Sequence, residues 1–185
     1  KMRLGRKRME IEVLRIGQRV VRDDRVTTHV ALVARSFGAK KIYMNEINPE
    51  INYTVSKINR TWGGDFKIEM IDDWKKIIRE KKNMATKIVH LTMYGQNIND
   101  IQTKLQNEDK LLVVVGAEKV PRTIYDIADY NVAIGSQPHS EISALGILLD
   151  RIQQGRQFDL KFKNSERVII PQEHGKSVQM NKLTD

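Results

Sequence analysis

LLVVVGAEKVP (residues 111–121) and NVAIGSQPHSE (residues 131–141) are the two stretches that decide the fold of this chain. Each is an apolar run that ends at a glycine, continues through a short polar turn containing a proline, and then enters a helical pattern. An apolar run without alternation is typical of a strand buried on both faces, as in a parallel sheet covered by helices. The two stretches therefore predict an α/β fold.

The two glycines at these strand ends, Gly116 and Gly135, predict a ligand pocket. Ligands of open α/β sheets bind in the crevice outside the carboxyl ends of the strands, and a glycine lets the main chain approach a ligand closely. The sequence contains neither GxGxxG after its first strand nor GxxxxGK[ST], so the usual cradles for charged polyphosphates are absent. A ligand recognised by main-chain amides and carbonyls fits better, such as an adenosine without phosphates.

Strand and helix patterns alternate through most of the chain. Strands are expected at residues 11–16, 41–45, 65–71, 87–93, 111–115 and 131–134. Helices are expected at residues 26–37, 51–62, 74–81, 98–105, 121–128 and 141–154. This order predicts one domain over residues 10–155, a mostly parallel sheet with helices on both faces. Residues 156–185 are expected to be a C-terminal extension with one strand-like patch, Val168–Ile170.

Composition favours a polyanionic partner. The 185 residues carry a net charge of +9, which is the balance found in nucleic-acid-binding proteins. Part of it lies in a basic N-terminal segment, residues 1–9, for which Met2 and Met9 are alternative natural starts. A generic basic surface with a solvated tail is the alternative.

Several classes of chemistry are disfavoured. The chain has no cysteine, which excludes disulfides, zinc–thiolate sites and cysteine nucleophiles. Its four histidines show no metal-ligand spacing, so no metal is expected. No apolar stretch reaches the roughly 20 residues that span a bilayer, and a cytoplasmic protein without a membrane segment is expected.

Arginines and a histidine surround the start of the first helix. Arg19, Arg22 and Arg25 lie in the preceding loop and could hold phosphates bidentately near a helix N-terminus. A solvated, salt-bridged loop is the alternative. At the start of the helix expected at residues 141–154, His139 and Glu141 are better explained as capping and packing residues than as acid–base groups.

Four segments in order, residues 22–39, 90–95, 115–121 and 131–141, resemble the archaeal tRNA cytidine 2′-O-methyltransferases that act at tRNA position 56. These belong to the SPOUT (SpoU–TrmD) superfamily, and the resemblance covers residues 12–155. It implies S-adenosylmethionine as cofactor, tRNA as partner and methylation of a T-loop cytidine ribose. It further implies a deep C-terminal trefoil knot and a homodimer whose active site lies near the subunit interface.

The resemblance also implies site residues. Those for the cofactor are Leu91, Gly116, Ala117, Glu118, Lys119, Val120, Val132, Ala133, Ile134, Gly135, Ser136, Gln137, Pro138 and His139. The wider SpoU group carries a functional arginine in the first helix, but alignment on Phe37-Gly38 puts Leu32 there. The catalytic role therefore moves to Arg22 or Arg25, with His29 as an alternative whose ordinary pKa suits a base.

Other functions remain open from the residues alone. One is a noncatalytic RNA-binding module that uses the same basic surface. Another is a SPOUT enzyme that modifies a different RNA nucleotide. A generic α/β enzyme acting on a small metabolite is the least favoured.

Overall fold

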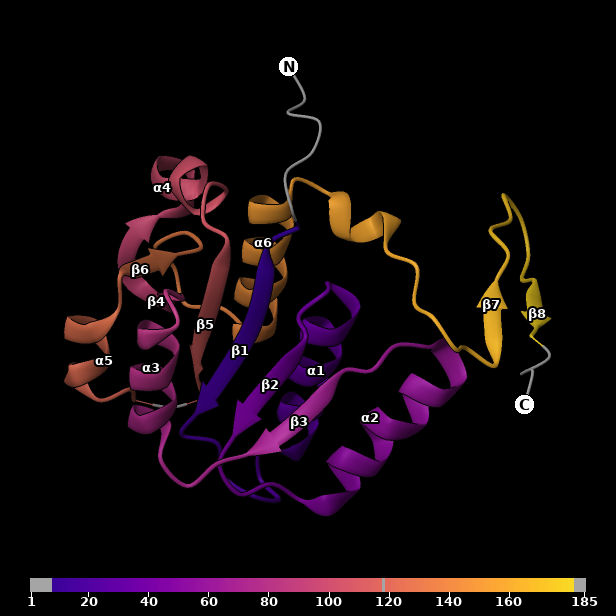
Figure 1. The fold of residues 1–185 in the computed structure, drawn as a ribbon, viewed down its shortest axis with the longest axis horizontal. Coiled ribbons are helices and arrows are strands. Elements are labelled where there is room, and N and C mark those ends of the chain that lie inside the picture. The colour runs from indigo at the N-terminus through magenta and orange to yellow at the C-terminus, as the bar shows by residue number, and fades with distance from the viewer. Residues whose placement is uncertain (1–7, 118, 182–185) are drawn as a thin grey trace.

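The computed structural model describes residues 8–117 and 119–181, and its body is a six-stranded sheet in the order β3-β2-β1-β5-β4-β6 (Figure 1). Every pair of neighbouring strands in it is parallel. The strands are β1 (Glu10–Ile16), β2 (Lys41–Met44), β3 (Lys67–Met70), β4 (Lys87–Asn97), β5 (Lys110–Gly116) and β6 (Tyr130–Ala133). The predicted parallel α/β sheet is confirmed.

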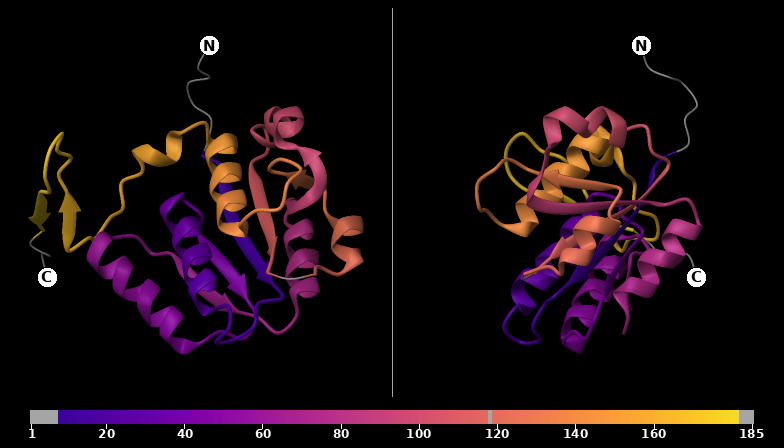
Figure 2. Two further views of the ribbon diagram at one scale, coloured as in Figure 1. Left: turned by 180° about the vertical axis from the view of Figure 1, so that it is seen from behind. Right: turned by 90° about the vertical axis from the view of Figure 1, so that its left-hand side faces the viewer.

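Helices cover both faces of this sheet, as predicted (Figure 2). The helices are α1 (Asp24–Ser36), α2 (Pro49–Trp62), α3 (Trp74–Asn83), α4 (Ile98–Leu105), α5 (Arg122–Ile127) and α6 (Glu141–Gln153). Buried side chains of α1, α2, α4 and α6 form one core with one face of the sheet. Those of α3 and α5 form a second core on the other face. Each core follows from the apolar stripe of its helices.

The longest departure from the predicted elements is β4. The apolar pattern predicts a strand that ends at Met93, whereas β4 continues to Asn97. Its pairing with β6 is interrupted, because Leu91 and Gln96 both face Val132. The residues between them form a bulge, and a bulge redirects the strand. Polar residues 94–97 hid this continuation, since the apolar pattern ends before them.

The extension after α6 runs through an irregular stretch and ends in a hairpin (Figure 1). It contains the 3₁₀ helix η1 (Arg156–Asp159) and the antiparallel pair β7 (Arg167–Ile169) and β8 (Val178–Met180). The strand-like patch at Val168–Ile170 thus corresponds to β7, whereas β8 was not predicted. The hairpin lies beside the end of α2.

Candidate active site

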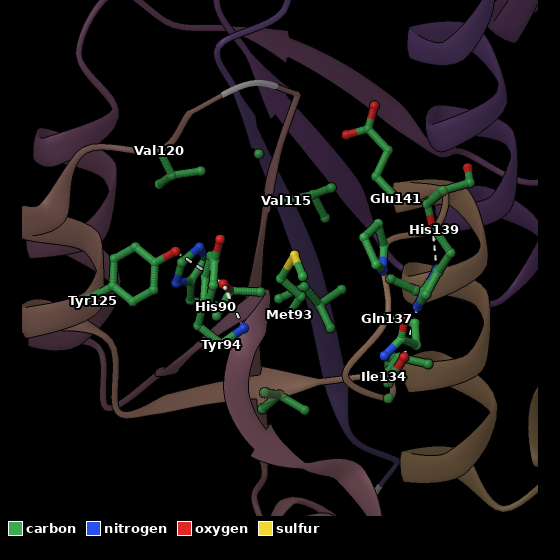
Figure 3. A pocket seen from close by; sticks show the side chains of 18 of the residues that line it. His90, Met93, Tyr94, Val115, Val120, Tyr125, Ile134, Gln137, His139 and Glu141 are labelled. Atoms are coloured by element: carbon green, nitrogen blue, oxygen red, sulfur yellow. Dashed lines mark hydrogen bonds between the residues drawn. The ribbon is translucent and has the colours of Figure 1, made fainter.

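A cavity of about 640 Å³ opens at the carboxyl ends of β5 and β6 (Figure 3). Gly116, at the end of β5, and Gly135, just after β6, both line it. The intervening strand β4 supplies a third wall through Leu91 and the bulge after it. The two strand ends therefore form walls of one pocket, as the sequence predicts.

The wall of this cavity is mostly apolar and carries a few polar groups. Its volume lies in the range of small-molecule and cofactor sites. The apolar part comes from Leu91, Val115, Val132, Ile134 and Ala144. Polar side chains enter from Thr92, Lys119, Arg122, Gln137 and Glu141. The mixture suits a nucleoside with a short polar tail.

His90 lies in this wall, and its neighbours orient its ring. Its Nδ1 is 2.9 Å from Oδ1 of Asn131, whose Nδ2 donates to the carbonyl of Tyr125 at 2.9 Å. Since the amide of Asn131 is thereby oriented, its oxygen is the acceptor and the proton lies on Nδ1 of His90. Burial lowers the pKa of His90, and its ring meets the Tyr125 ring edge-on at 4.7 Å.

The turn between β6 and α6 is held by its own residues. Nε2 of His139 lies 2.7 Å from the carbonyl of Ile134, and Ser140 caps α6 by accepting from the amide of Ile142 at 3.1 Å. Gly135 has φ of 72°, and a Cβ built on it would have no atom within 4 Å. The main chain at Gly135 is therefore open to a bound group.

Arg15 is a buried residue behind the cavity wall that was not predicted from the sequence. It is fully buried at the end of β1 and donates to Oε1 of Glu141 at 2.7 Å and to the hydroxyl of Thr27. It thus joins the first turn of α6, which lines the cavity, to the first turns of α1. The available signal was a charged residue inside an apolar strand, since a buried arginine requires a partner.

Most of the predicted cofactor residues border the cavity. They are Leu91, Gly116, Lys119, Val120, Val132, Ile134, Gly135, Gln137, Pro138 and His139. Ala117, Ala133 and Ser136 do not line it, and Glu118 lies outside the described residues. Residues that sequence reasoning did not assign, such as Tyr125 and Ala144, line it from α5 and α6.

The predicted catalytic residues lie elsewhere on the surface. Arg22, Arg25 and His29 are exposed at the start of α1, and none lines the cavity. The loop before α1 is held by its own carboxylates. Asp23 accepts from the amide of Arg19 at 2.8 Å, which lowers the pKa of Asp23. The salt-bridged alternative thus holds for Arg19 and Asp23, which pair at 3.5 Å.

The described part of the chain carries neither a metal site nor a membrane-spanning helix. Across residues 8–117 and 119–181, no group of three or more potential ligands could hold a metal ion. Within the same residues, no helix has the length and apolar character to cross a membrane.

The fold places the chain in a class. A TrmH/SpoU tRNA modifying enzyme from A. aeolicus superposes with a TM-score of 0.58 at 19% identity, covering 82% of this chain and 76% of that one. An AdoMet-bound rRNA methyltransferase from Sinorhizobium meliloti gives 0.58 at 15% identity, covering 79% of this chain and 56% of that one. The chain therefore shares the fold of these two RNA-modifying enzymes.

Closer relatives define the family. A tRNA (cytidine(56)-2′-O)-methyltransferase from Nitrosopumilus maritimus is 64% identical over 177 residues, covering 96% of this chain and all of that one. Another with this name, from Thermococcus kodakarensis, is 51% identical, covering 92% and 97%. The family model described as tRNA ribose 2′-O-methyltransferase, aTrm56, matches residues 62–179. The chain belongs to this family.

Proposed function

We propose that this protein transfers the methyl group of S-adenosylmethionine to the ribose 2′-hydroxyl of cytidine 56 in the T-loop of tRNA. The observation that carries the proposal is the nucleoside-sized cavity at the carboxyl ends of β5 and β6, in a chain of the tRNA ribose 2′-O-methyltransferase family. A tRNA substrate supports the cytoplasm as the location that we propose.

The cavity residues fit S-adenosylmethionine. Gly135 leaves main chain open to a nucleoside, and the apolar side chains of Leu91, Val132 and Ile134 provide walls for an adenine ring. Lys119 and Arg122 line the cavity on the α5 side, where a cation suits the carboxylate of an amino-acid tail. When bound, the cofactor supplies an electrophilic methyl group on a positively charged sulfur.

The protein's contribution to the reaction is mainly positioning. Holding the hydroxyl in line with the methyl group can supply several kcal/mol. Arg22 and Arg25 are proposed to hold the RNA phosphates beside the reacting nucleotide, since a guanidinium is a poor base but a good phosphate ligand. His29 is proposed as the group that takes the hydroxyl proton, with an arginine orienting the hydroxyl as the alternative.

A homodimer would explain why these three residues lie away from the cavity. They stand exposed at the start of α1, so a second copy could receive them at its own cavity. Mixing tests this arrangement. A variant with Arg22, Arg25 and His29 replaced by alanine is mixed with a cavity-blocked variant, Gly135→Val. A site built from two chains regains activity in the mixed dimer, and a site within one chain does not.

We further propose that the fold contains a trefoil knot. Its support is the close approach of two main-chain segments at Gly95, inside the β4 bulge. A Cβ built on Gly95 would lie 2.5 Å from the carbonyl of Asn131 and the amide of Val132. Glycine alone permits this approach. The segment at Asn131 would then pass through the loop that contains Gly95.

The deciding experiment is incubation with unmodified tRNA transcript and methyl-labelled S-adenosylmethionine, followed by nuclease digestion and mass analysis. Label recovered as 2′-O-methylcytidine at position 56 is the expected result. Label at another nucleotide would favour a related SPOUT activity. Binding of tRNA without binding of cofactor would favour a noncatalytic RNA-binding module and overturn the proposal.

A further inference from the structure

A second concave surface lies at the opposite end of the sheet from the cavity. It is a groove of about 390 Å³ at the amino ends of β1, β2 and β3. One side is formed by Lys40 and Phe66, which lie just before β2 and β3, and the other by residues 160–164 of the extension. We call it the basic groove, because five of its lining residues are cations and one, Asp65, is an acid.

The extension is built into this end of the body. The amide of Gly64 donates to the carbonyl of Lys163 at 2.8 Å. Gly63 and Gly64 have φ of 84° and 90°, and added Cβ atoms would lie 2.6 Å from the carbonyl oxygen of Lys163 and 2.9 Å from the ring of Phe162. These glycines end α2, and because they have no side chain they also let the extension pack directly against their main chain.

A buried arginine fixes the floor of the basic groove. Arg35, at the end of α1, is 7% exposed and donates to Oδ1 of Asn59 at 2.7 Å and to the carbonyl of Gly63. Its guanidinium lies 4.9 Å from the centre of the Phe162 ring. The contact is a cation–π interaction, and it holds residues 161–163 in place.

The remaining cations face solvent. Lys161 and Lys163 are exposed, and neither has an acidic partner among residues 8–117 and 119–181. Lys40 pairs with Glu10 at 3.0 Å. Two unpaired lysines on a fixed segment, beside Arg8 and above a buried arginine, form a positive concavity. Such a surface attracts closely spaced negative charges.

We propose that the basic groove binds backbone phosphates of the same tRNA whose nucleotide enters the cavity. The inference rests on the proposed function, because the proposed tRNA substrate is the polyanion that the groove would bind. Along the strand direction, the seven residues of β1 extend over about 23 Å at 3.3 Å per residue, which is the height of the sheet between its two ends. A folded RNA is larger than this span, so one molecule can reach both ends of the sheet. The extension would thus act as part of the RNA-binding surface.

The test compares two double charge reversals of equal size. Lys161→Glu/Lys163→Glu alters the basic groove, and Lys76→Glu/Lys82→Glu alters exposed lysines of α3 on the other face of the sheet. Affinity for unmodified tRNA transcript is measured against salt concentration for the full chain. S-adenosylmethionine affinity and the thermal midpoint are measured in parallel.

The groove variant is expected to lose about tenfold in tRNA affinity and about two in the slope of log K against log salt, roughly one for each lysine. Its cofactor affinity and thermal midpoint are expected to match the wild type, and the α3 variant is expected to lose much less. Unchanged tRNA binding by the groove variant would overturn the inference. Equal losses in both variants would show an effect of net charge alone and also overturn it.

Two further outcomes can be distinguished from tRNA binding by the groove. A changed mass of the groove variant in analytical ultracentrifugation, with unchanged tRNA affinity, would assign the groove to contact between copies and overturn the inference. Methylation by the wild type is scored separately. A wild type that binds tRNA through the groove but does not methylate it would overturn the proposed function and leave the groove standing.

Discussion

The two ends of the sheet have opposite chemistry although they belong to one sheet, with the cavity at β4, β5 and β6 and the groove at β1, β2 and β3. The carboxyl end carries a cavity of about 640 Å³ with mostly apolar walls, and the amino end carries a groove of about 390 Å³ lined by five cations. The first suits a nucleoside cofactor and the second suits a polyanion. The difference shows that one parallel sheet can present two kinds of recognition surface, each formed by the segments that join its strands.

The buried link at the cavity end gives the largest expected effect. Arg15→Met leaves the carboxylate of Glu141 without its guanidinium, and the free energy of unfolding is expected to fall by about 3–5 kcal/mol. Urea denaturation measures this. Arg15→Met/Glu141→Gln removes both charges and is expected to recover much of the loss. Equal instability of the single and double variants would contradict an ion-pair origin.

The close approach at Gly95 gives the next largest effect. Gly95→Ala places a methyl group against the main chain of Asn131 and Val132, and overpacking of this kind costs about 1–3 kcal/mol. Because these segments also wall the cavity, cofactor affinity is expected to fall with stability. Calorimetry with S-adenosylmethionine measures both. Gly175→Ala, on an open loop where a Cβ meets nothing within 4 Å, controls for loss of a glycine and is expected to leave cofactor affinity unchanged.

At the amino end, Phe162→Ala should have a smaller effect. It removes the ring that lies over Arg35, and we expect a loss of about 1–2 kcal/mol in the free energy of unfolding. Phe162→Tyr keeps the ring and serves as control. Cofactor affinity is expected to stay unchanged in both variants, and a fall in it would show that the two ends are energetically coupled.

The smallest effect is a dependence of stability on pH from His90. Burial lowers its pKa in the folded state, so the unfolded chain binds the proton more readily. Stability is therefore expected to be full above about pH 6.5 and to decrease as the pH falls below it, by at most about 1.4 kcal/mol per pH unit. Unfolding in urea from pH 5 to 8 measures this slope. His90→Phe should flatten it, and an unaltered slope would assign it to other groups.

Sequence patterns predicted the parts of the molecule whose signals are local. The apolar runs before Gly116 and Gly135 predicted both strands and the pocket between them, because each signal lies within one strand and its turn. The helices that cover the sheet followed from stripes of apolar residues. Their bounds differ by only a few residues, for example Asp24–Ser36 in place of residues 26–37.

The parts that were missed depend on contacts between distant residues. Arg15 and Glu141 are 126 positions apart, and nothing near either residue identifies the other. The β4 bulge depends on where Asn131 passes, and the roles of Gly63 and Gly64 depend on a segment 100 residues later. The helix expected at residues 51–62 ends just before these glycines, which is correct for α2, but that expectation does not include their contact with residues 162–163.

The packing of residues 160–164 against the body has a consequence for any truncated form of the protein. The patterned part of the sequence ends near Gly155, which invites truncation there. Such a truncation would remove the carbonyl that accepts from Gly64 and the ring that lies over Arg35. Phe66, now 6% exposed, would lose the neighbouring wall. A shortened protein would therefore bring a hydrophobic side chain and bare peptide groups to its surface, and loss of solubility is the outcome to expect.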